Sequence, residues 1–71
     1  MGVIIPKYRV STSLSDYDFD NAWEAKAKFE ALKERASLWK RYTTKQGRVT
    51  LIGHKWKRYQ NGRNIFFDYR N

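Results

Sequence analysis

The pair Asn61-Gly62 constrains the fold of this chain more than any other feature of its sequence. Two runs rich in β-branched and aromatic residues, 48–60 and 63–69, flank the pair directly. Asn-Gly is the preferred centre of a type I′ turn, because both central positions of that turn need positive φ. The sequence therefore predicts a β-hairpin whose register is fixed by the turn.

The predicted register sorts the hairpin side chains onto two faces, since successive residues of a strand point to opposite sides. One face holds the opposite pairs Trp56 with Phe67, Arg58 with Ile65, and His54 with Tyr69. The other face holds Lys57 with Phe66, Tyr59 with Asn64, and Lys55 with Asp68. We expect the first face to form the core and the second to face solvent.

Val49 and Leu51 have the opposite parity to Trp56 and would point away from this core in an uninterrupted strand. A β-bulge at Gly53-His54 would return both residues to the core side, because it adds one residue to one strand only. The alternative is a turn at Gly53-His54 between two short strands.

The segment before the hairpin has a helical pattern. Apolar residues recur at spacings of three and four, at Ala22, Ala25, Phe29, Leu32, Ala36 and Trp39. This spacing predicts a helix over residues 20–41. Asn21 followed by Glu24 fits a capping box, although Asp18 or Asp20 could also serve as the cap.

Residues 3–12 are rich in β-branched and aromatic side chains, and Tyr8 and Val10 alternate with Lys7 and Arg9. This pattern predicts a first strand, with Pro6 at an edge or at the strand start. The polar, acidic residues 13–20 are expected to connect this strand to the helix. The predicted fold is a single small α+β domain over residues 1–71, with the order β-α-β-β. Its mainly antiparallel sheet has three strands in the spatial order first, third, second, and the helix packs on one face.

Charge is distributed unevenly along the 71 residues. Residues 35–71 contain ten lysines and arginines and one acid, whereas residues 1–34 contain five basic and six acidic residues. A field of one sign over half of a small domain attracts polyanions. The sequence therefore points to an acidic binding partner.

The predicted solvent face combines lysines with aromatic rings, a combination that suits single-stranded nucleic acid because phosphates take the charge and bases stack on rings. A solvated face whose lysines only maintain solubility is the alternative. The residues predicted to contact a partner are Lys7, Arg9, Arg48, Lys55, Lys57, Arg58, Tyr59, Arg63 and Phe66.

No enzymatic or metal site is predicted. Asp16, Asp18 and Asp20 alternate like the first ligands of an EF-hand, but Asn21 stands where glycine is needed and Ala27 where a bidentate glutamate is needed. His54 is the only histidine, and the chain has no cysteine, so thiolate zinc sites and disulfides are excluded. We expect no cofactor.

The preferred function is a non-enzymatic module that contacts single-stranded DNA, RNA or nucleoprotein. The alternative is a small inhibitor, encoded by a virus or mobile element, that docks on an acidic protein or nucleoprotein surface. Small phage anti-CRISPR proteins are similar in size and in having one helix on a small antiparallel sheet, a resemblance of type without a shared motif. A structural subunit of a ribonucleoprotein or virion is a third possibility. We expect a soluble cytoplasmic protein with no membrane association, as a monomer or weak homodimer.

Overall fold

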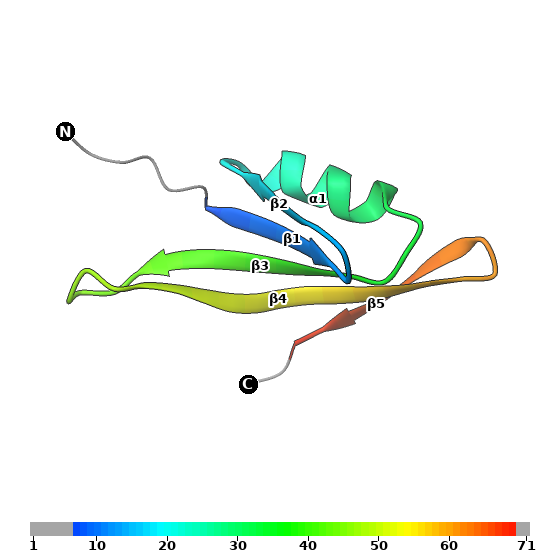
Figure 1. The fold of residues 1–71 in the computed structure, drawn as a ribbon. Helices are drawn as coiled ribbons and strands as arrows, with labels where there is room; N and C mark the ends of the chain where they lie inside the picture. Colours follow the sequence, from blue (N-terminus) through cyan, green and yellow to red (C-terminus); the bar gives the residue numbers. More distant parts are fainter. Residues whose placement is uncertain (1–6, 70–71) are drawn as a thin grey trace.

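A computed structural model describes residues 7–69, which form a five-stranded antiparallel sheet with one helix against one face (Figure 1). The prediction of a three-stranded sheet is wrong. The spatial order is β2-β1-β3-β4-β5, so the last strand lies at an edge and not in the centre as predicted. The elements are β1 (Tyr8–Thr12), β2 (Asp16–Phe19), α1 (Ala22–Ala31), β3 (Ala36–Thr43), β4 (Val49–Gln60) and β5 (Arg63–Asp68).

The strand predicted over residues 3–12 is present as β1, and its residues 3–6 lie outside the described part of the chain. The segment predicted as a polar connection contains β2, which pairs antiparallel with β1. Tyr17 and Phe19 pack against the core, whereas Asp16 and Asp18 are exposed. This short acidic segment therefore alternates as an edge strand does.

The helix begins as predicted but ends early. Asn21 is its N-cap, and the backbone N–H of Glu24 donates to Asn21 Oδ1 at 2.9 Å, which confirms Asn21 over the two aspartates. The helix ends at Ala31 instead of near residue 41, because Leu32 adopts extended backbone angles. The remainder of the predicted helix is the central strand β3.

In β3, buried side chains recur every two residues, as in a strand, and not every 3.6 residues, as in a helix. Ala36 and Leu38 are both buried beneath the helix. Trp39, which pairs with Arg9 of β1 and Gly53 of β4, points to the other side of the sheet. The segment also carries Tyr42 and Thr43, residue types that favour strands over helices. Pairing with a strand on each side decides between the two periodicities.

The β4–β5 hairpin confirms the predicted turn and register. Asn61 and Gly62 both have positive φ, at 54° and 76°. Trp56 pairs with Phe67, and Lys57 pairs with Phe66.

The predicted bulge is also confirmed. Leu38 lies opposite Lys55 and Trp39 lies opposite Gly53, so His54 is the extra residue of β4. The bulge brings Leu51 to the same side of the sheet as Trp56. That side, however, is the one without the helix.

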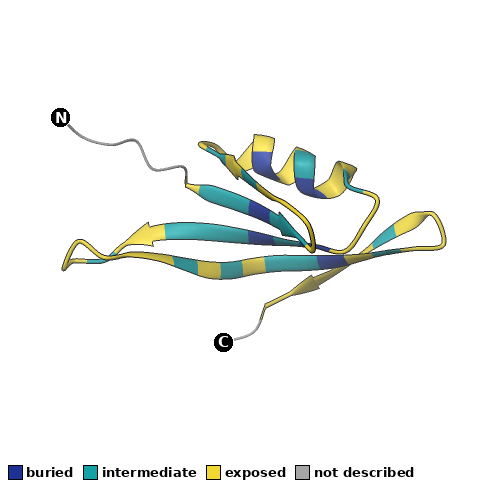
Figure 2. Cartoon of the chain, viewed as in Figure 1, coloured by how far each residue is buried: buried dark blue, intermediate teal, exposed yellow. Residues whose placement is uncertain are grey.

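The core lies between α1 and the strands β1 and β3 (Figure 2). Its members are the buried residues Val10, Ala25, Phe29, Ala36 and Leu38, with Tyr8, Tyr17, Phe19 and Leu32 packed at their margin. No helix within residues 7–69 has the length and apolar character needed to cross a membrane.

Candidate binding face

The end of the helix lies against the face of the hairpin that was predicted to be open. Lys57 is fully buried, and its Nζ donates to the Leu32 carbonyl and, at 2.7 Å, to Asn64 Oδ1. The rings of Phe29 and Phe66 lie 5.9 Å apart. The prediction that Lys57 faces solvent is therefore wrong, whereas Lys55 and Tyr59 are partly exposed and Phe66 is exposed. Strand alternation shows which residues share a face, but it does not show which face a helix covers.

Lys57 and Asn64 fasten the hairpin to the end of the helix. Asn64 Nδ2 donates to the Glu30 carbonyl at 2.8 Å, and Leu32 is the C-cap residue. Carbonyls at the end of a helix lack partners within the helix, so these side chains satisfy them. Burial lowers the pKa of Lys57 below its usual value, and the nearby carboxylates of Glu34 and Glu30 oppose this shift. Lys57 is a structural residue in this fold.

Aromatic and cationic side chains lie together on the side of the sheet away from the helix. We call this side the open face. It holds Arg9, Ser11, Arg35, Ser37, Trp39, Arg41, Leu51, Trp56, Arg58, Ile65, Phe67 and Tyr69. Of these, Arg58 and Arg9 belong to the predicted partner-contacting set, and strand alternation places Arg63, opposite Gln60, on the same side of the hairpin.

Two aromatic pairs lie on the open face. The rings of Trp56 and Phe67 stack with centroids 4.3 Å apart and an interplanar angle of 16°. The rings of Trp39 and Tyr69 are 5.5 Å apart, and the Tyr69 hydroxyl donates to Ser37 Oγ at 3.1 Å. Tyr69 lies directly over Gly53, where a Cβ atom would be 2.7 Å from its ring, so the bulge glycine makes room for the second pair.

Two exposed arginines lie against the first aromatic pair. The guanidinium of Arg35 is 5.1 Å from the Trp56 ring centroid. The guanidinium of Arg58 is 5.7 Å from Trp56 and 5.9 Å from Phe67. A cation over a ring face is held by the ring quadrupole. The planar N–H donors of such a group suit phosphate oxygens.

The part of the open face formed by β1 and β2 is less positive than the rest. Arg9 contacts Asp18 through two bonds, from Nε at 2.9 Å and from Nη2 at 3.3 Å. The Arg9 bond lowers the pKa of Asp18, and the same bond raises the pKa of Arg9. Asp16 is exposed on the same strand. The positive charge available to a polyanion is therefore concentrated over β3, β4 and β5.

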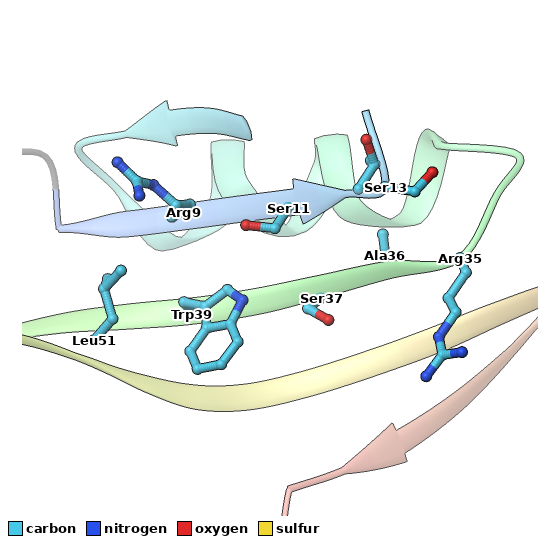
Figure 3. Close-up of a pocket in the computed structure, with 9 residues that line it drawn as sticks. Arg9, Ser11, Ser13, Arg35, Ala36, Ser37, Trp39 and Leu51 are labelled. Atoms are coloured by element: carbon cyan, nitrogen blue, oxygen red, sulfur yellow. The ribbon is translucent and has the colours of Figure 1, made fainter. Parts of the chain in front are cut away.

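A groove of about 550 Å³ lies on the open face over the paired strands β1 and β3 (Figure 3). Its lining combines two arginines, one tryptophan and several hydroxyls. The residues are Arg9, Ser11, Thr12, Ser13, Arg35, Ala36, Ser37, Trp39 and Leu51.

The remaining predicted residues lie apart from this groove. Lys7 is exposed before β1, Arg48 is exposed in the β3–β4 turn, and Arg63 is exposed beside the β4–β5 turn. Sequence reasoning missed Arg35, Trp39, Trp56, Phe67 and Tyr69 as surface residues. The alternation of Arg35, Ser37 and Trp39 was the available signal, and the helical spacing concealed it.

Residues 7–69 contain no group of three or more histidine, cysteine or acidic side chains that could hold a metal ion. Comparison with protein families, with curated proteins and with solved structures gives no match. Function is therefore inferred from the open face itself.

Proposed function

We propose that this protein is a non-enzymatic module that binds single-stranded nucleic acid on the open face. The observation that carries the proposal is the contact of Arg35 and Arg58 with the stacked rings of Trp56 and Phe67. These side chains place N–H groups that can donate hydrogen bonds to phosphate beside ring surfaces on which bases can stack. The protein has a formal net charge of +8. The proposal includes a cytoplasmic location, where such strands are accessible.

Single strands suit this face better than duplexes. Stacking on a protein ring requires a base whose own face is free, and each stacked base contributes about 1 to 3 kcal/mol. Duplex readers commonly insert a helix into the major groove. The only helix within residues 7–69 is covered on one side by the sheet, and it carries Glu24 and Glu30 beside Lys26 and Lys28. Its charge is balanced, which makes it a poor phosphate contact.

The test is fluorescence anisotropy with a labelled single-stranded oligonucleotide, starting at about 50 mM salt. Each phosphate contact contributes about 0.7 to the slope of log K against log salt. The double variant Arg35→Gln/Arg58→Gln should weaken binding and reduce that slope. The matched control is Lys26→Gln/Lys33→Gln, which removes the same charge from exposed positions outside the open face. Trp56→Leu should weaken binding while leaving the salt slope unchanged.

Equal losses in the two double variants would show that only net charge matters, and would refute the open face as the site. If neither DNA nor RNA binds at about 50 mM salt, the nucleic-acid proposal fails. The inhibitor alternative would then be tested by pull-down from nuclease-treated lysate, with the arginine double variant as the control.

A further inference from the structure

The groove over β1 and β3 presents its polar and aromatic groups in a fixed order along its length (Figure 3). The strand register places Arg9 opposite Trp39 and Ser11 opposite Ser37, and Arg35 precedes β3. An indole therefore lies near one end, two hydroxyls lie in the middle, and a guanidinium lies at the other end. Trp39 and Arg35 are four positions apart in the chain, which is about 13 Å along a strand.

The two arginines of the groove differ in available charge. Arg9 is occupied by its two bonds to Asp18. Arg35 forms no ion pair within residues 7–69, and its guanidinium lies over the Trp56 ring. An anionic group entering the groove therefore meets an arginine without an ion pair at the Arg35 end, whereas Arg9 at the other end is held by Asp18.

The middle of the groove offers hydroxyl groups. Ser37 Oγ accepts a hydrogen bond from the Tyr69 hydroxyl, so its own proton is free to be donated. Ser11 lies opposite Ser37 on the neighbouring strand. Sugar hydroxyls and ring oxygens are suitable partners for such groups.

We propose that this groove holds one nucleotide, with its base against Trp39, its sugar beside Ser11 and Ser37, and its phosphate on Arg35. The inference rests on the proposed function and refines it by assigning a subsite for a single nucleotide unit. The rest of a bound strand leaves from the Arg35 end toward Trp56 and Phe67, because the carboxylates of Asp16 and Asp18 repel phosphates on the β2 side. A nucleoside monophosphate alone should therefore occupy the groove.

The test is a titration of the full chain with adenosine 5′-monophosphate, followed by amide chemical shifts in NMR spectra. Adenosine and ribose 5-phosphate serve as the two halves of the ligand. We expect shifts concentrated in residues 9–13 and 35–39, with the monophosphate binding more tightly than either half. Arg35→Gln should weaken the monophosphate and ribose 5-phosphate but leave adenosine unchanged.

Trp39→Leu should weaken the binding of the monophosphate and of adenosine about 5- to 150-fold, the range that corresponds to one stacked base. It should leave ribose 5-phosphate unchanged, which separates loss of stacking from loss of fold. Trp23→Leu is the matched control, because Trp23 is an exposed tryptophan on the helix, far from the groove in the fold. It should change none of the three affinities.

If the monophosphate produces no saturating shift of groove amides up to about 10 mM, a tenfold margin over millimolar binding, the subsite is refuted. Unchanged binding in Trp39→Leu would equally overturn it. In both cases oligonucleotide binding with its salt slope could persist, so the proposed function would stand. Loss of oligonucleotide binding is measured separately by anisotropy, and would remove the proposed function itself.

Discussion

Lys57→Met should destabilise the protein strongly, although the sequence predicts this lysine to be a surface residue. Methionine preserves most of the side-chain volume but removes both hydrogen bonds that Lys57 donates. The Leu32 carbonyl and Asn64 Oδ1 then lose their donor in a partly buried site. Each acceptor left unsatisfied costs about 1 to 3 kcal/mol.

The buried ammonium itself carries a desolvation cost that methionine does not have, which offsets part of this loss. We therefore expect a decrease in the free energy of unfolding of about 2 to 3 kcal/mol, in the lower half of the range for two acceptors. For a domain of this length that lowers Tm by roughly 10 to 20 °C. Such a loss is a large part of the total stability of a small domain.

The assay is urea unfolding followed by circular dichroism, with thermal melts in parallel. Lys55→Met is the matched control, because Lys55 lies two positions earlier on the same side of β4 and is partly exposed. Both variants lose one positive charge, so their difference isolates the buried hydrogen bonds. Equal stability of the two variants would refute the structural role of Lys57.

Three further outcomes follow from the geometry. Gly53→Ala should cost about 1 to 3 kcal/mol, because its Cβ would meet the Tyr69 ring, and should alter the near-UV dichroism of the Trp39–Tyr69 pair; unchanged dichroism would contradict the close approach. The lowered pKa of Lys57 means that the unfolded chain holds this proton more tightly, so the contribution of Lys57 rises with pH toward 10.5. The stability difference between wild type and Lys57→Met, measured by urea unfolding, should therefore grow as the pH rises over that range. A difference that shrinks would contradict the lowered pKa of Lys57. The lowered pKa of Asp18 means that its ion pair with Arg9 stabilises the folded protein above pH 3.8 and that this stabilisation is lost at lower pH. For so exposed a pair it is below about 1 kcal/mol. In acid titrations, the stability of Asp18→Asn should lack this pH-dependent component.

The features that the sequence predicts correctly are local ones. Asn61-Gly62 sets the hairpin register through the φ angles of two residues, and Asn21 caps the helix three residues from its partner. The Gly53-His54 bulge follows from parity within a single strand. None of these depends on contacts between distant segments.

The features that the sequence does not predict depend on distant contacts. The segment Ala36–Thr43 fits either a helical or a strand pattern, and pairing with β1 and β4 selects the strand. The covered face of the hairpin is selected by contacts of Lys57 with Leu32 and of Asn64 with Glu30, across 25 and 34 residues. Both faces carry aromatic rings, so composition alone does not distinguish them.

The candidate site was predicted in kind but not in place. The mixture of cations and aromatic rings is present, and Arg9 and Arg58 of the predicted contact residues lie on the open face. The predicted register places Trp56 and Phe67 on the face that was expected to form the core. In the structure they cover each other by stacking, and they use the arginine side chains as further cover.

The ribbon formed by the distal parts of β3 and β4 has consequences for hydrogen exchange. Pairing with β1 ends at Lys40 and pairing with β5 begins at Lys55, so within residues 7–69 the two strands beyond these points are held mainly by each other (Figure 1). Amides there can exchange by local fraying, whereas the amides of Val10 and Leu38 exchange only when the whole domain unfolds. The β3–β4 turn, which carries Lys45 and Arg48, can therefore change conformation while the part of the sheet paired with β1 and β5 keeps the rings of the open face in place.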